Sequence, residues 1–209
     1  GEAKLHEGKK KEAISFFEKA YQLAKNADYA KAYYLVLKEN QLMREGFLLL
    51  EAYLKQNPND IEMKRFLATA YLIHQEPNKA KKHFSEILKV AQNDVISLNN
   101  LAHVYLQSKE PDKAYEVAKK AYEHMPENPL IADTYAWILI LRKEPDKAVP
   151  ILAKVLKQTP DSSALRYHMA VGLYEMGQEN QAKSELELVL RDDDNFPDKA
   201  QAHEFLQTI

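Results

Sequence analysis

The chain has 209 residues, 45% of them hydrophobic and 29% charged, with a formal net charge of −2 at pH 7. This balance is typical of a soluble folded protein and excludes an intrinsically disordered chain. Lysine and glutamate are interspersed without a basic stripe, so we expect no nucleic-acid partner. The chain has no cysteine, which excludes disulfides and thiolate metal sites, and no run of the ~18 apolar residues that a membrane span requires.

The first 60 residues contain two weak copies of a helical hairpin. Residues 1–26 are expected to hold a truncated first helix and a second helix, with the lysines at 9–11 in a solvated loop between them. Residues 27–60 form the second copy, with Pro58 after its second helix. Because the chain opens with Gly1 partway through a copy, we expect a fragment whose preceding segment has been removed.

From residue 61 the pattern repeats every 34 residues, in units spanning 61–94, 95–128, 129–162 and 163–195. The eighth position of each unit is small: Ala68, Ala102, Ala136 and Ala170. The eleventh is large and apolar: Tyr71, Tyr105, Leu139 and Leu173. The twentieth is alanine: Ala80, Ala114, Ala148 and Ala182. A period of this size is typical of stacked supersecondary units, and small residues beside large ones suit crossing helices.

A turn of Glu-Pro, Asn or Asp, Lys and Ala occurs in three of these units, with its proline at Pro77, Pro111 and Pro145. Proline is favoured at the first position of a helix, so we expect each of these residues to open a second helix.

The last segment, residues 196–209, is predicted to be a helix that covers the end of the array. It has one apolar stripe, formed by Ala202, Phe205, Leu206 and Ile209. The acidic run before it, 192–195, lacks the alternating ligands, glycine and distal glutamate of a calcium loop. We therefore expect Asp194 or Asn195 to cap a helix instead of binding a metal.

This set of positions resembles the tetratricopeptide repeat, and the likeness covers nearly the whole chain. It implies an all-α fold: a right-handed superhelical solenoid of antiparallel helix pairs with a C-terminal capping helix, in one continuous domain. It also implies a concave groove lined by the first helices, in which a protein or peptide partner binds.

Carried onto this sequence, the groove positions of the family fall on twelve residues of four units. They are Arg65, Thr69, Asn99, Asn100, His103, Gln107, Asp133, Thr134, Trp137, Tyr167, His168 and Tyr174. Aromatic anchors with polar neighbours suit a peptide groove. Two alternatives stay open: several of these side chains pack between adjacent first helices, or the strip stacks on the sugar rings of a polysaccharide.

No catalytic constellation is visible, so we expect no enzyme, cofactor or metal. The sequence has no glycine-rich phosphate loop, and the pairs His6-Glu7 and His203-Glu204 lack the second histidine of a zinc protease helix. The carboxylate clamp of chaperone-binding relatives is incomplete as well. Leu130 and Thr134 stand where two of its cationic donors would be.

A looser likeness is to bacterial cell-envelope proteins of the family, including those of exopolysaccharide export and exosortase systems. It depends on residues 164–170, on Tyr174 and Gly177, and on residues 195–197. It implies a periplasmic or envelope-associated scaffold for assembly or export partners, with a cytoplasmic location as the alternative.

Overall fold

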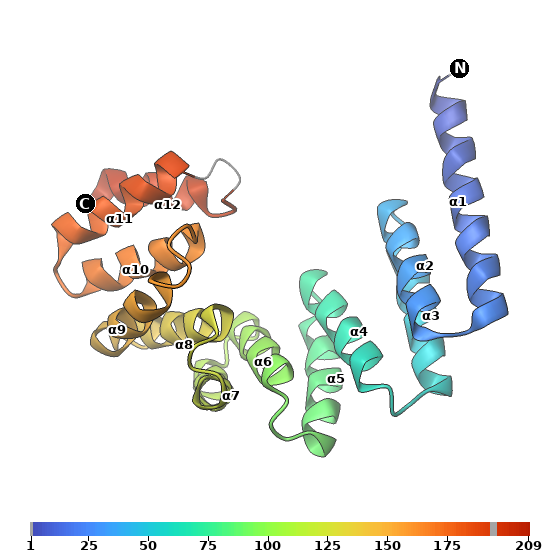
Figure 1. Ribbon diagram of the computed structural model, residues 1–209, viewed down its shortest axis with the longest axis horizontal. Coiled ribbons are helices and arrows are strands. Elements are labelled where there is room, and N and C mark those ends of the chain that lie inside the picture. The colour runs from blue at the N-terminus through green and yellow to red at the C-terminus, as the bar shows by residue number, and fades with distance from the viewer. Residues whose placement is uncertain (1, 193–195) are drawn as a thin grey trace. The chain divides into compact units, whose positions relative to one another are not determined.

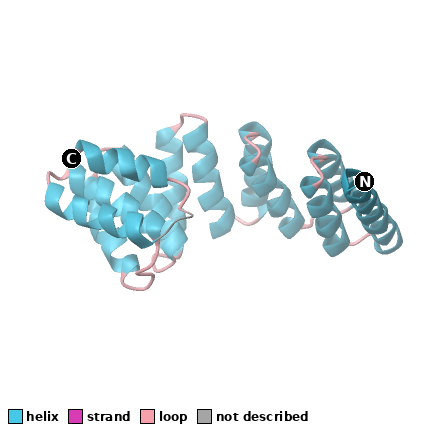
Figure 2. Cartoon of the chain, turned by 90° about the horizontal axis from the view of Figure 1, so that it is seen from above, coloured by secondary structure: helices cyan, strands magenta, loops and turns pink. Residues whose placement is uncertain are grey.

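The computed structural model describes residues 2–192 and 196–209, which form twelve α-helices (Figure 1). None of these residues lies in a strand, and Figure 2 shows helices joined by short loops. In chain order the helices are α1 (Glu2–Ala24), α2 (Ala27–Glu39), α3 (Met43–Gln56), α4 (Ile61–Ile73), α5 (Pro77–Val90), α6 (Val95–Gln107), α7 (Pro111–His124), α8 (Pro129–Leu141), α9 (Pro145–Leu156), α10 (Ser163–Glu175), α11 (Glu179–Asp192) and α12 (Lys199–Thr208). The expected all-α fold of helix pairs is confirmed.

The chain divides into two compact units, Gly1–Ile87 and Leu88–Ile209. In the first unit, α2 packs against α1 and α3, and α3 packs against α4. In the second, each helix from α6 to α12 packs against the next, and α8 also contacts α6 and α10. The boundaries of the individual repeats, and their union in one continuous domain, stay predictions.

The alanines of the repeat pattern lie at the helix crossings. All eight, at the eighth and twentieth positions of the four units, have 0% of their surface exposed. A side chain of this size lets two helix backbones approach closely while larger neighbours fill the grooves. In the second unit these neighbours include Leu139, Leu152 and Val155, which are all fully or almost fully buried. The period in the sequence therefore reflects the packing of the core.

A side-chain cap precedes five first helices at the same 34-residue interval. Each cap accepts a hydrogen bond from a backbone N–H of the first turn, which would otherwise lack a partner inside the helix. The caps are Asn26, Asp60, Asp94, Asn128 and Ser162. They define where α2, α4, α6, α8 and α10 begin.

The turn from each first helix into its second helix contains one residue in the left-handed region of the backbone. These residues are also 34 apart, with φ between 58° and 75°: Gln41, Gln75, Lys109, Lys143 and Gly177. The left-handed conformation ends one helix and lets the chain reverse direction. Immediately after the turn, Pro77, Pro111 and Pro145 each occupy the first position of a second helix, as the sequence predicts.

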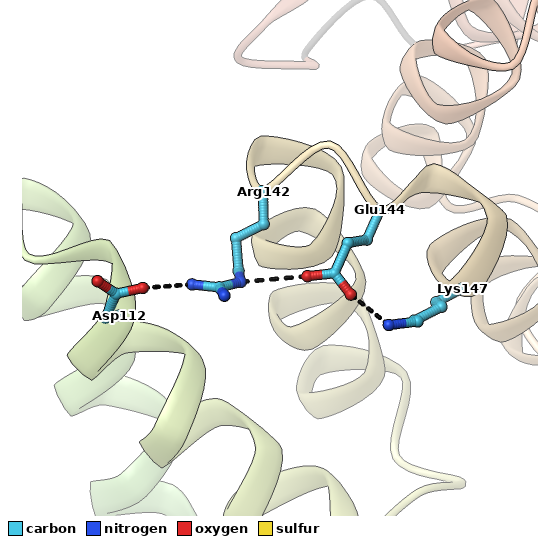
Figure 3. Close-up of polar contacts among 4 residues, drawn as sticks. All are labelled: Asp112, Arg142, Glu144 and Lys147. Carbon is cyan, nitrogen blue, oxygen red and sulfur yellow. Dashed lines mark hydrogen bonds and ion pairs between the residues drawn. The ribbon is translucent and has the colours of Figure 1, made fainter.

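Charged side chains tie one of these turns to its neighbours. Arg142 lies between two carboxylates: its Nη1 is 2.5 Å from Asp112 Oδ1 on α7, and its Nε donates to Glu144 Oε1 at 3.3 Å (Figure 3). Glu144 also pairs with Lys147 at the start of α9. The Arg142 guanidinium lies 4.5 Å from the ring centroid of Tyr115, in a cation–π contact. The α8–α9 turn is thereby held against α7.

The N-terminal segment differs from the expectation. Residues 2–24 form one uninterrupted helix, so the predicted loop at the lysines of 9–11 is wrong. The physical reason is that lysine and glutamate favour helix, while a single exposed glycine, Gly8, costs the helix only about 1 kcal/mol.

The C-terminal segment packs on the end of the second unit. Phe196 and Ala202 are buried with Ala182 and Leu186 of α11, and Phe205, Leu206 and Ile209 pack against this cluster. The predicted apolar stripe of 196–209 therefore covers its neighbour. The expected caps Asp194 and Asn195 lie outside the described residues.

We predict that Gly172→Ala destabilises the second unit. A Cβ at Gly172 would lie 2.9 Å from Val149 Cγ2 and 3.3 Å from Ile140 Cδ1. Valine is stiff at χ1 and cannot easily turn away, and overpacking a core costs about 1–3 kcal/mol. This cost outweighs the gain in helix propensity of roughly 0.5–1 kcal/mol. Thermal unfolding followed by circular dichroism should show a lower Tm.

Gly8→Ala is the matched control, because no atom lies within 4 Å of a Cβ at that helical position. Its Tm should stay the same or rise. Equal losses in the two variants would contradict the packing described around Gly172.

Candidate binding face

The candidate binding face lies on the first helices of the second unit. Helix α8 contacts α6 on one side and α10 on the other, so side chains of three first helices meet along it. We use the name α6–α8–α10 face for six residues on these helices: Asn99, His103, Asp133, Thr134, Trp137 and His168. All six belong to the predicted groove.

The strongest contacts on this face join α8 to α10. His168 Nδ1 is 2.6 Å from Asp133 Oδ1, so a ring N–H of His168 donates to the carboxylate. The same imidazole stacks on Trp137, with ring centroids 4.3 Å apart and an interplanar angle of 21°. One face of the indole is therefore covered by His168, and both rings are held in place, since all three side chains are half-buried.

A second contact joins α8 to α6. The hydroxyl of Thr134 donates to the backbone oxygen of Leu130 at 2.9 Å, and His103 Nε2 lies 3.2 Å from the same hydroxyl. Because the single hydroxyl proton is used toward Leu130, Thr134 Oγ1 must accept from His103. This places the proton of the neutral His103 ring on Nε2.

Burial lowers the pKa of His103 below its ordinary value, although solvent still reaches part of the side chain. The carboxylate of Asp133 raises this pKa and His168 lowers it, but the desolvating protein around the ring has the largest effect.

One polar atom on the face lacks a partner. Asn99 Oδ1 is shielded from solvent and forms no hydrogen bond within the described part of the chain. Leaving a buried amide oxygen unpaired costs about 1–3 kcal/mol. Asn99 precedes His103 by four residues, so the two side chains lie on the same side of α6.

The other predicted groove residues do not belong to the α6–α8–α10 face. Asn100 and Gln107 also lie on α6, half-buried and exposed respectively. Tyr167 and Tyr174 contact the C-terminal segment: Tyr167 lies 5.8 Å from the Phe196 ring and Tyr174 lies 5.2 Å from the Phe205 ring. Tyr167 also lies 5.9 Å from the His168 ring, at the margin of the face.

The remaining two predicted residues belong to the first unit. Arg65 and Thr69 on α4 line a recess of about 280 Å³. Lys31 of α2 also lines it, with its ammonium 5.9 Å from the ring centroid of Phe66. The sequence pattern did not indicate Lys31 or Glu62, which complete this recess.

We predict a pH dependence that involves His103. Because its pKa is lower in the folded protein than the ordinary value of 6.5, the unfolded chain binds more protons at mildly acidic pH. The contribution of His103 to the free energy of unfolding should therefore be fully present above pH 6.5. It should fall as the pH drops below 6.5 toward the pKa of the folded state. Urea unfolding followed by Trp137 emission at about pH 7.5 and about pH 5.5 would measure this fall.

His103→Gln is the informative variant, since its amide can still donate to Thr134 but does not titrate. It should show a smaller loss of stability between the two pH values. An identical loss in both proteins would assign the pH dependence to other groups.

Residues 2–192 and 196–209 were compared with the requirements of a metal site and of a membrane-spanning helix. No group of three or more histidine, aspartate or glutamate side chains there could hold a metal ion. In the same residues, every helix is too short or too polar to cross a membrane.

The chain belongs to the tetratricopeptide repeat family. One model of this family matches residues 1–124 and a second matches residues 139–209. Tetratricopeptide repeat proteins are in general non-catalytic scaffolds for protein–protein interaction. A comparison with curated proteins finds no match to the sequence.

Solved structures agree with the family. A tetratricopeptide repeat protein from Parabacteroides merdae has a TM-score of 0.68 at 16% identity, over 97% of this chain and 78% of its own. TTC0263 of Thermus thermophilus has a TM-score of 0.65 at 18% identity, over 96% and 100%. YrrB, described as having an unusual peptide-binding site, also has 0.65, at 17% identity over 91% and 97%. At these identities the likeness concerns the fold.

Proposed function

We propose that this protein is a non-catalytic scaffold that binds a peptide segment or helix of a partner protein on the α6–α8–α10 face. The observation that carries the proposal is the arrangement of Trp137, His168 and Asp133, in which a stacked aromatic pair is fixed by a carboxylate. A rigid indole buries a large area at low cost in conformational entropy, as binding anchors generally do.

The polar groups of the α6–α8–α10 face are suited to a peptide backbone. Asn99 has an unpaired amide oxygen, and Asp133 and His168 place a carboxylate and an imidazole side by side. A peptide presents N–H donors and C=O acceptors in alternation, and such groups can pair with both kinds of side chain.

The alternative ligand is a polysaccharide, and the geometry of the indole makes it the weaker candidate. Sugar rings stack on an open aromatic face, but one face of Trp137 is already occupied by His168 at 4.3 Å. The YrrB likeness and the family favour a peptide. We retain the polysaccharide as an outcome of the test below.

The proposal includes the cellular location of the protein. The likeness of residues 164–170 to bacterial envelope members of the family supports an envelope or periplasmic role in assembly or export, with a cytoplasmic location as the alternative. Cell fractionation of the native host with an antibody against this chain would decide between the two locations.

A selection from a random peptide library would test the binding function. The chain has a single tryptophan, so a change in its emission reports on the surroundings of Trp137 in the α6–α8–α10 face. Selected peptides should produce a saturable change in the parent protein and bind His168→Ala at least about tenfold more weakly. Glu116→Ala, an exposed position on the second helix α7, is the matched control and should bind as the parent does.

Two results would contradict the proposal. One is peptide binding that is unchanged in His168→Ala. The other is saturable emission change with an oligosaccharide panel but with none of the selected peptides, which would assign the face to the alternative ligand.

A further inference from the structure

The first unit contains a pocket that the groove does not include. It has a volume of about 540 Å³, within the usual range for small-ligand sites. Its wall is formed by α3, by the end of α4 and by the turn into α5. Its lining includes Arg44, Phe47, Leu48, Glu51, Tyr71 and His74. None of them belongs to the α6–α8–α10 face.

One wall of the pocket is aromatic and rigid. Phe47 stacks on Tyr71 with ring centroids 4.4 Å apart and an interplanar angle of 25°. His74 meets Phe47 edge to face, with centroids 5.8 Å apart. Next to these rings Leu48 is 56% exposed, so it adds accessible apolar surface to this wall. This wall can receive an apolar group.

Most of the charged side chains that line the pocket already have partners. Glu51 accepts a hydrogen bond from the hydroxyl of Tyr71. Glu76 pairs with Lys79 at 3.5 Å, and the same ammonium lies 5.0 Å from the centroid of the Tyr71 ring. Glu76 is thereby paired with a cation, whereas Glu51 is bonded to a neutral hydroxyl and keeps its negative charge in the pocket.

Two side chains of the pocket, Arg44 and His74, have nitrogen atoms that are available for a ligand. Arg44 is exposed and forms no ion pair or hydrogen bond with any residue that the structure describes. His74 Nε2 is shielded from solvent and likewise lacks a partner among the described residues. The torsion that turns an imidazole ring is broad, so a small rotation can direct a ring N–H toward a ligand. A guanidinium and an imidazole N–H together form a donor set for a carboxylate.

We propose that this pocket binds an apolar carboxylate, whose aryl or alkyl group lies against Phe47 and Leu48 and whose carboxylate pairs with Arg44 and His74. The same chemistry is present in a free organic acid and in the C-terminal residue of a peptide. The carboxylate of Glu51 repels the carboxylate of the ligand. Binding therefore requires the Arg44 and His74 donors together with the apolar wall.

Titration of the ¹⁵N-labelled protein with 3-phenylpropionate, its amide and the matching amine tests the proposal. The acid should shift the backbone amide signals of residues 43–51 and 71–79 in a saturable way. The amide and the amine should bind at least about tenfold more weakly, because they cannot form charge-assisted hydrogen bonds to both donors.

Three variants locate the interaction. Arg44→Gln and His74→Phe should each weaken binding of the acid at least about fivefold; the first is an exposed side chain without a partner, and the second keeps the aromatic packing. Lys157→Gln, an exposed cation of the second unit, should leave binding unchanged.

A short peptide that ends in phenylalanine with a free carboxylate distinguishes the two sources of the ligand, a free organic acid and a peptide C-terminus. Binding more than about tenfold tighter than that of the small acid would indicate a peptide terminus, and a smaller difference would indicate a free acid.

The proposal is overturned if no saturable shift occurs in these segments, if the amine binds as tightly as the acid, or if Arg44→Gln and His74→Phe both bind like the parent. Because the pocket and the α6–α8–α10 face share no residue, each of these results leaves the proposed function of the face unaffected.

Discussion

Replacing Trp137 by alanine is expected to weaken the binding of selected peptides by about 30-fold or more, which corresponds to roughly 2 kcal/mol or more. Trp137 is the largest side chain of the α6–α8–α10 face and is stacked on His168, which in turn is held by Asp133. Truncation removes the anchor and also releases the imidazole from its stacked position. The loss should therefore exceed the loss seen in His168→Ala.

Isothermal titration calorimetry is the appropriate measurement, since the variant lacks the fluorescent reporter. Trp137→Phe should lose less affinity than Trp137→Ala, because it keeps a ring in place. Far-ultraviolet circular dichroism must show the same helical content in all proteins. Parent-like affinity in a folded Trp137→Ala would show that the peptide binds elsewhere.

Leu152→Ala is expected to destabilise the second unit more than Gly172→Ala does, with a loss of about 2–5 kcal/mol. Leu152 lies on α9 with 0% of its surface exposed, in the cluster that includes Ala136, Leu139 and Leu165 of the first helices. Truncation removes buried methyl groups and leaves a cavity between helices that cannot close without shifting their axes.

Leu141→Ala is the matched control, since the same atoms are removed from a side chain that is 49% exposed. It should lose less than about 1 kcal/mol. Urea unfolding followed by Trp137 emission would measure both variants within the second unit. Losses of similar size would mean that α9 does not pack as described.

The fold was predictable because its signal is repeated. Small residues at the eighth and twentieth positions recur in four units, and each is completely buried at a helix crossing. Proline at the start of three second helices is a local rule that requires no tertiary information, and the structure confirms it. Repetition thus compensates for the weakness of each single position.

The helix caps and the left-handed turn residues are two further periodic features that the sequence-based predictions do not include. The caps from Asn26 to Ser162 have side-chain types that favour helix starts, so a search for them at the repeat interval would have found them. The left-handed turn residues are harder to find, because only Gly177 among the five is a glycine. Local backbone hydrogen bonds close each of these turns, such as the bond from Glu76 N–H to the Tyr71 carbonyl at 2.9 Å, and they hold glutamine and lysine in a conformation that such residues rarely adopt.

The N-terminal loop prediction failed for a physical reason. The lysines at 9–11 indicate exposure, and an exposed helix face has the same composition as a loop. The structure places them on α1. A cluster of charges does not distinguish the two, whereas a left-handed residue or a cap would have marked a real turn.

The repeat positions predict which helix faces carry the candidate residues, but they do not predict the contacts of these residues. Family positions selected Asp133 and His168, but their pairing joins residues 35 apart in the chain and depends on how α8 packs on α10. The same positions selected Tyr167 and Tyr174, whose rings turn out to meet the C-terminal segment. The repeat position of a residue predicts the helix face on which it lies, whereas its contacts depend on how the neighbouring helices pack.

Hydrogen exchange with and without a saturating selected peptide is the most direct test of the central claim, that the first helices of the second unit form the recognition surface. We predict added protection in α6, α8 and α10, with α7, α9 and α11 unchanged. Protection confined to α7, α9 and α11 would contradict the account.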